Sequence, residues 1–231
     1  MQAHSHHPLV DIDNIVPYFQ PIYNLSTGSV LRYECFPRAL TQYDAWMPTG
    51  EITCIAREQI TAALTRLMVE RSNAFCRPRQ MHWNINLFDA DLDDNLVLET
   101  VTEICNQVDK GLCGIEIPYS AVKNNPQVLG QLVRRLPQLF VTVDDVFECS
   151  NELLAIIASG INAIKLRGEL LKTPAIQQQF ISIEKIQQYC ETYNVLLIAE
   201  NIEDQEILDA VADLQIQYGQ GFFLSVSNRL S

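Results

Sequence analysis

Short apolar runs alternate with longer amphipathic segments along almost the whole chain. The short runs are rich in β-branched residues and are typical of buried strands, whereas the longer segments repeat apolar residues at helical spacing. Two strand-like runs at 16–25 and 29–36 flank a Ser-Thr-Gly turn and predict an antiparallel hairpin. Further strands are predicted at 81–88, 113–119, 139–145, 162–167, 195–201 and within 216–225, and helices at 51–75, 89–108, 126–136, 150–160, 175–194 and 204–214.

The alternation of strands and helices predicts parallel strands joined by crossover helices. Roughly eight strands in a chain of 231 residues fit an α/β fold of the TIM-like (β/α)8 barrel type better than an open sheet. The N-terminal hairpin adds one antiparallel strand, which departs from the regular barrel. We expect a short, flexible leader at 1–15, followed by a single domain at 16–231.

Composition and charge narrow the function. The net charge of −12 argues against nucleic acid and against an anionic membrane as partners. The N-terminus does not resemble a signal peptide, no run is long and apolar enough to cross a bilayer, and the seven cysteines include no C-x-x-C pair. We therefore expect a cytoplasmic protein. If its ligand is an anion, cations must mediate the binding.

Polar and charged residues stand at or near the carboxyl end of the predicted strands. In a barrel these ends converge on one face, where active sites form. Acidic residues are almost never fully buried unless they are paired, so a series of them is hard to explain as packing, although any one alone could be a surface carboxylate just past a strand. The series is Glu34, Asn84, Glu116, Asp144, Asp145, Lys165, Glu200 and Gln220.

The residue types in this series suit a metal site. Carboxylate and amide oxygens from separate strands form a cage of hard ligands for Mg²⁺ or Mn²⁺. The adjacent Asp144 and Asp145 can bridge two ions, and two positive ions would offset the repulsion between the two carboxylates. Lys165 adds a cation that can orient a water molecule or hold a phosphate.

The same residues lie in segments that resemble, in order and at the usual spacing, the motifs of the bacterial EAL domain family of cyclic di-GMP phosphodiesterases. The resemblance runs from about residue 19 to residue 224. "YFQPIYNLSTGSV" resembles the family's opening QPI…TG hairpin, "YECFPR" stands for E-A-L-x-R, "WNINLF" for N-x-S, "IEIPYS" for E-x-T-E, "VDDVFE" for D-D-F-G-x-G, "IKLR" for K-x-D, "AENIE" for A-E-G-x-E, and "YGQGFFLS" for the closing Q-G-F/Y.

The resemblance implies a TIM-like barrel that hydrolyses cyclic di-GMP to pGpG with two Mg²⁺ or Mn²⁺ ions. Arg38 would grip a phosphate, Gln20 and Gln220 would lie near the ligand, and Glu203 would support the site. The implied ligands are Glu34, Asn84, Glu116 and Asp144 for the first ion and Asp144, Asp145 and Glu200 for the second. Lys165 and Glu200, with Glu34 in the same catalytic set, would position or deprotonate the attacking water.

The chain departs from the family pattern around the loop that follows the two aspartates. Val146, Phe147, Glu148 and Cys149 replace F-G-x-G, so both glycines of a tight turn are absent. Further departures are Cys35 and Phe36 in place of the A-L of E-A-L, Asn201 for Gly in A-E-G, Pro118 for Thr and Tyr119 for the second Glu of E-x-T-E, and Arg167 for Asp in K-x-D.

These observations leave three hypotheses open. The complete set of ligands favours a phosphodiesterase, with turnover that is slow or dependent on a partner. The altered loop favours a cyclic di-GMP receptor without turnover, or an interaction module that regulates another protein. The segment 175–194 could support a homodimer, but an amphipathic helix packed on the core has the same pattern. We expect regulation to act on the barrel or to come from a partner protein.

Overall fold

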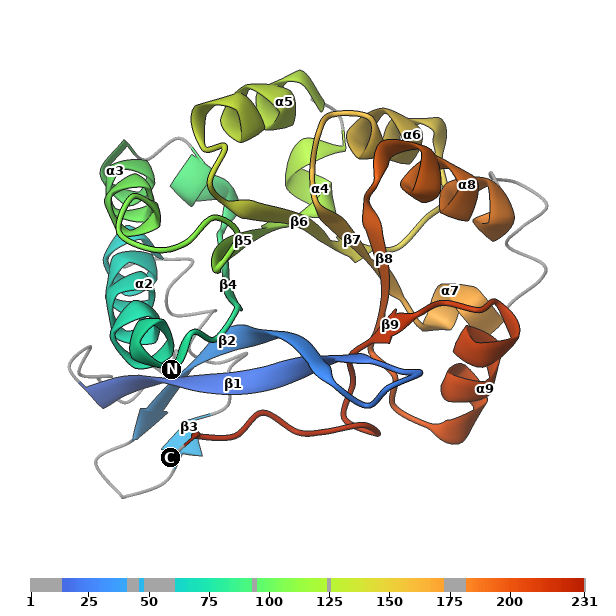
Figure 1. Ribbon diagram of the computed structural model, residues 1–231, viewed down its shortest axis with the longest axis horizontal. Coiled ribbons are helices and arrows are strands. Elements are labelled where there is room, and N and C mark those ends of the chain that lie inside the picture. Colours follow the sequence, from blue (N-terminus) through green and yellow to red (C-terminus); the bar gives the residue numbers. More distant parts are fainter. Residues whose placement is uncertain are drawn as a thin grey trace, which may run out of the picture.

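The computed structural model describes residues 14–40, 46–47, 61–92, 95–123, 126–172 and 182–230. Within this part of the chain, eight strands close into a barrel and helices surround it, which confirms the predicted fold class (Figure 1). The short strand β3 (Trp46–Met47) is not part of the barrel and pairs antiparallel with the last two residues of β2. The barrel strands are β1 (Ile15–Asn24), β2 (Val30–Leu40), β4 (Trp83–Asn86), β5 (Cys113–Pro118), β6 (Phe140–Val146), β7 (Ala163–Arg167), β8 (Leu196–Glu200) and β9 (Tyr218–Gly219).

The predicted antiparallel strand is β1, which closes the barrel. It pairs antiparallel with β2 on one side and with β9 on the other, whereas β2, β4, β5, β6, β7, β8 and β9 run parallel. In the hairpin, Gln20 stands opposite Glu34. At the turn, the Asn24 side chain accepts hydrogen bonds from the backbone N–H groups of Ser26 and Thr27, as turn asparagines commonly do.

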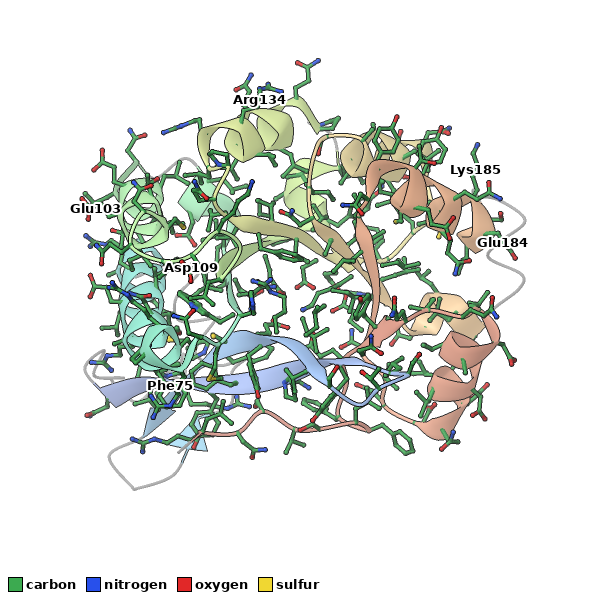
Figure 2. The ribbon with its side chains drawn as sticks, viewed as in Figure 1. Phe75, Glu103, Asp109, Arg134, Glu184 and Lys185 are labelled. Carbon is green, nitrogen blue, oxygen red and sulfur yellow. The ribbon has the colours of Figure 1, made fainter. Side chains whose placement is uncertain are left out.

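The helices lie outside the ring of strands, and their apolar faces form the core against it (Figure 1). Charged side chains such as Glu103, Arg134, Glu184 and Lys185 point away from the barrel (Figure 2). The described helices are α2 (Thr61–Cys76), α3 (Asn95–Cys105), α4 (Tyr119–Val122), α5 (Pro126–Arg135), α6 (Asn151–Ile157), α7 (Glu169–Lys172), α8 (Ile183–Tyr193) and α9 (Gln205–Asp213).

Some helix boundaries differ from the sequence prediction. The helix predicted at 89–108 is divided into the 3₁₀ turn η3 (Asp89–Leu92) and α3. In η3, Asp91 accepts hydrogen bonds from the Phe88 N–H and the Thr65 hydroxyl, which hold a separate turn. Residues 51–60, 173–181 and the leader up to residue 13 lie outside the described residues.

Replacement of Ser150 by alanine should cost about 1–2 kcal/mol of unfolding free energy. Ser150 caps α6 by accepting a hydrogen bond from the Leu153 N–H, and its hydroxyl also lies 2.9 Å from the Tyr119 hydroxyl. Ser182→Ala is the matched control, because Ser182 caps α8 in the same way from an exposed position. Urea unfolding should show a smaller loss for the control; equal losses would mean that the Tyr119 contact adds no stability.

Candidate functional site

The centre of the site is the ammonium group of Lys165, which is 1% exposed and projects from β7 into the barrel. Its Nζ lies 2.5 Å from Glu34 Oε2, 2.6 Å from Glu116 Oε2 and 3.2 Å from Asp144 Oδ1. These three carboxylates come from β2, β5 and β6. The structure therefore brings together four of the residues predicted from the strand ends.

One ammonium group does not balance the carboxylates that surround it. Burial, followed by the charge of Glu34, raises the pKa of Glu116 to about 8, although Lys165 opposes the shift. Burial and neighbouring carboxylates also raise the pKa values of Asp144 and Glu200. Burial alone would lower the pKa of Lys165, but attraction to Asp144, Glu116 and Glu34 raises it well above its ordinary value. The centre needs further positive charge.

Several oxygen atoms in this centre are suited to a metal ion. One carboxylate oxygen each from Glu34, Glu116 and Asp144 lies within 4.8 Å of the others. Glu200 Oε1 and Gln220 Oε1 are buried without a hydrogen-bond partner among the described residues, and Asp144 Oδ1 has the ion pair with Lys165 but no aligned hydrogen bond. Unpartnered buried oxygens are costly, and hard divalent cations prefer such ligands. The residues present therefore fit a divalent ion.

The two asparagines of β4 take different places. Asn84 Oδ1 accepts a hydrogen bond from Arg32 Nε at 2.6 Å, and Asn84 Nδ2 donates to Glu116 Oε1 at 2.7 Å. Asn86, two residues closer to the carboxyl end of β4, donates to Glu34 Oε1 at 2.8 Å. Asn84 thus lies deeper in the barrel than Asn86, farther from the carboxyl end of β4, and its oxygen accepts a hydrogen bond from Arg32. Asn86 lies beside the carboxylates and is absent from the sequence-based ligand set.

Arg32 forms the floor of the site. It is buried inside the barrel, and its Nη2 donates to the Trp83 carbonyl at 3.0 Å while its guanidinium lies 3.8 Å from the centre of the Phe140 ring. Burial lowers its pKa to about 10, and attraction to Glu116 opposes that shift. Sequence reasoning missed Arg32, although strand periodicity places it on the same face of β2 as Glu34.

Asp145 does not join the carboxylates around Lys165. Its backbone φ is +59°, at an irregularity of the β6–β7 ladder, and its side chain pairs with Arg167. Arg167 Nη2 donates to Asp145 Oδ2 at 2.8 Å, and Arg167 Nε donates to Oδ1. Both side chains are partly exposed, by 46% for Asp145 and 37% for Arg167. Both oxygens of Asp145 are therefore engaged by a guanidinium.

Of the predicted ligand-binding residues, Gln220 is closest to the centre. Its Nε2 donates to Glu34 Oε2 at 2.8 Å. Gln20 donates to the Ser225 carbonyl and Arg38 to the Ser227 hydroxyl, so both are tied to the C-terminal segment. Glu203 is exposed in the loop after β8. In the same loop Asn201 has φ +54°, a left-handed conformation that asparagine tolerates better than most residues.

The loop that follows the aspartates is anchored through Tyr119. The Tyr119 hydroxyl donates to Glu148 Oε1 at 3.1 Å, lies 2.9 Å from the Ser150 hydroxyl, and Glu148 pairs with Lys123 at 2.6 Å. Phe147 packs edge-on against the Tyr119 ring, with 5.4 Å between ring centres. Tyr119 thus holds this loop at the position where the resemblance places a glutamate.

Fold and site together define a TIM-like barrel whose carboxyl end carries carboxylates from several strands around one lysine. The chain belongs to the EAL domain family, whose model matches residues 7–227. The cyclic di-GMP phosphodiesterase PdeA of Borreliella burgdorferi is 22% identical over 216 residues, which are 89% of this chain and 32% of PdeA. The chain thus spans about a third of that curated relative.

Solved EAL domains have the same fold. The Xanthomonas citri FimX EAL domain, in complex with cyclic di-GMP, has a TM-score of 0.80 and 18% identity, covering 94% of this chain and 89% of that one. The Bacillus subtilis YkuI protein, in complex with cyclic di-GMP and calcium, has a TM-score of 0.78 and 17% identity, covering 96% of this chain and 56% of that one. At these identities the likeness shows the fold.

Proposed function

We propose that this chain binds cyclic di-GMP at the carboxyl end of its barrel and hydrolyses it to pGpG with the help of a divalent metal ion, Mg²⁺ or Mn²⁺. The convergence of Glu34, Glu116 and Asp144 on one point carries the proposal, since their oxygens lie within 4.8 Å of one another. The phosphodiesterase activity named for PdeA, and the cyclic di-GMP and calcium in the YkuI structure, support it.

The ligands that we propose for the ion are Glu34, Asn86, Glu116 and Asp144. Asn86 replaces the predicted Asn84, because the oxygen of Asn84 accepts a hydrogen bond from Arg32. A divalent ion at this place would make a bound water more acidic and would offset charge on the phosphate. The chain's own residues would then position the reactants.

Lys165 and Glu200 are the proposed residues for the attacking water. Lys165 lies among the carboxylates, where its ammonium group can donate a hydrogen bond and hold a water in place. Glu200 Oε1 is buried without a hydrogen-bond partner among the residues that the structure describes, and it can accept a proton from that water. Arg38 and Gln20, on the hairpin, would contact the ligand together with Gln220, and Glu203 would support the loop after β8.

A cyclic di-GMP receptor without turnover is the second candidate function. The pairing of Asp145 with Arg167 favours it, because this pairing removes a ligand that the family resemblance assigns to a second ion. In that case the barrel would bind the dinucleotide without cleaving it.

No helix within the described ranges is long and apolar enough to cross a membrane. From the sequence we also propose a cytoplasmic location, a homodimer and a regulatory protein partner.

The test is to incubate the purified chain with cyclic di-GMP and Mn²⁺ or Mg²⁺ and to separate the nucleotides by chromatography. We expect pGpG to form, to disappear with EDTA and to fall at least about a hundredfold in Glu34→Ala, which loses a carboxylate central to the cluster. Intact cyclic di-GMP, with binding detected by calorimetry, would support the receptor instead. If the chain neither bound nor cleaved cyclic di-GMP, both functions would be refuted.

A further inference from the structure

Arg167 engages Asp145 in a geometry that leaves little room for another cation. The two parallel hydrogen bonds from Nε and Nη2 use both carboxylate oxygens, the arrangement in which arginine binds a carboxylate most tightly. The left-handed backbone of Asp145 turns this side chain away from the Lys165 cluster. The Arg167 guanidinium thus occupies the two Asp145 oxygens that would otherwise be available to a metal ion.

Arg167 also lies next to Glu200, the fourth acidic residue near Lys165. It stands in register with Glu200 on the neighbouring strand and two residues beyond Lys165 on the same face of β7. Glu200 is 8% exposed, and its Oε1 has no hydrogen-bond partner within the described structure. Two of the three carboxylates that the resemblance implies for a second ion, Asp145 and Glu200, therefore face Arg167.

The remodelled loop holds Arg167 in this place. The Arg167 guanidinium lies 5.9 Å from the centre of the Phe147 ring, and the Lys123 ammonium lies 5.6 Å from it. Phe147 in turn packs on Tyr119, and Glu148 pairs with Lys123. Cations over an aromatic face are attracted to it, so the loop without glycines favours the paired position of Arg167.

We propose that Arg167 is a built-in replacement for a second metal ion and that the chain binds one divalent ion instead of two. The ion would be held by the Glu34 cluster, and the fixed guanidinium would supply the other positive charge facing the ligand. The charge count agrees. With a cation bound, all five carboxylates (Glu34, Glu116, Asp144, Asp145 and Glu200) would be ionised, and with three cations (Arg32, Lys165 and Arg167) they would leave two negative charges, which one divalent ion balances.

This inference rests on the proposed metal-dependent function, and metal stoichiometry tests it without a measurement of activity. The metal-stripped chain is titrated with Mn²⁺ by calorimetry, and bound Mn²⁺ is counted by equilibrium dialysis. We expect one ion per wild-type chain and two in Arg167→Asp, which frees Asp145 and adds a carboxylate. If Arg167→Asp fails to fold, Arg167→Gln replaces it in the test. Glutamine is neutral and similar in length to arginine, so this variant should also bind a second ion, with weaker affinity.

The matched control is Arg134→Asp, which makes the same charge change on the exposed face of α5 (Figure 2). It should bind one ion, like the wild type. Two ions in the wild type, or one ion in folded variants of both types at position 167, would overturn the inference. No bound ion would refute the metal-dependent function and the inference with it, whereas one ion without hydrolysis would refute only the hydrolysis.

Discussion

Lys165→Met should make the stability of this protein depend on metal. In EDTA at pH 8.5 we expect a loss of about 3–5 kcal/mol, because Glu34, Glu116 and Asp144 would lose the cation within 2.5–3.2 Å of their oxygens. Methionine fills much of the same volume, so the loss reports charge more than packing. Saturating Mn²⁺ should restore most of the stability in thermal unfolding, since a divalent ion binds the folded state preferentially.

The pH dependence of this loss follows from Glu116. Its raised pKa of about 8 means that protonation below that pH removes one of the repelling charges. A group with a raised acidic pKa contributes stability at low pH and loses that contribution as the pH rises through its folded-state value. The loss in Lys165→Met should therefore be smaller at pH 6 than at pH 8.5.

Lys172→Met is the control for the loss of a lysine charge. Lys172 pairs with Asp204 and Glu206 on the surface, where solvent screens such pairs and they contribute little to stability. It should change stability little, with or without Mn²⁺. The geometry indicates that Lys165 stabilises the charged forms of Glu34, Glu116 and Asp144. If Lys165→Met were as stable in EDTA as the wild type, that conclusion would be wrong.

The convergence of the polar strand ends could be predicted because it depends on the fold alone. In any closed parallel barrel, residues such as Glu34, Glu116 and Lys165 at corresponding heights of their strands face the same interior. Apolar strands and long amphipathic helices gave a pattern clear enough to predict that barrel. The four-residue helices α4 and α7 are too short for helical periodicity to be visible in the sequence.

The depth of each side chain in the barrel could not be predicted in the same way. Asn84 and Asn86 both face inward because they are two residues apart. Asn84 is the one in register with Glu34, yet its oxygen accepts a hydrogen bond from Arg32, and it is Asn86 that donates to Glu34. Strand register alone therefore does not tell which asparagine lies beside Glu34. Asp145 depends on a local irregularity and a positive φ, for which two adjacent aspartates carry no signal. Arg167 was noted as a departure from the family pattern, but its partner became evident only from the structure.

Gly114→Ala should unfold most of the protein, with a loss of more than about 4 kcal/mol or no soluble protein at all. A methyl group at position 114 would lie 2.1 Å from Asn84 Oδ1, 2.7 Å from Arg32 Nη2 and 2.7 Å from the Phe140 carbonyl oxygen. The carbonyl belongs to β6, which pairs with β5 at this position, so it cannot retreat without opening the barrel. Arg32 and Asn84 are buried among the same atoms and cannot retreat easily either.

Gly130→Ala is the matched control for this substitution. Gly130 lies inside α5, and a methyl group there would be 3.5 Å from Arg134 Nη1, which is an ordinary contact. It should stabilise the protein by about 0.5–1 kcal/mol, since alanine loses less conformational freedom in a helix than glycine. The same chemical change should therefore have opposite signs at the two positions, measured by urea unfolding. An unchanged stability in Gly114→Ala would mean that Arg32 does not lie inside the barrel beside Asn84, and the floor of the site would have to be placed elsewhere.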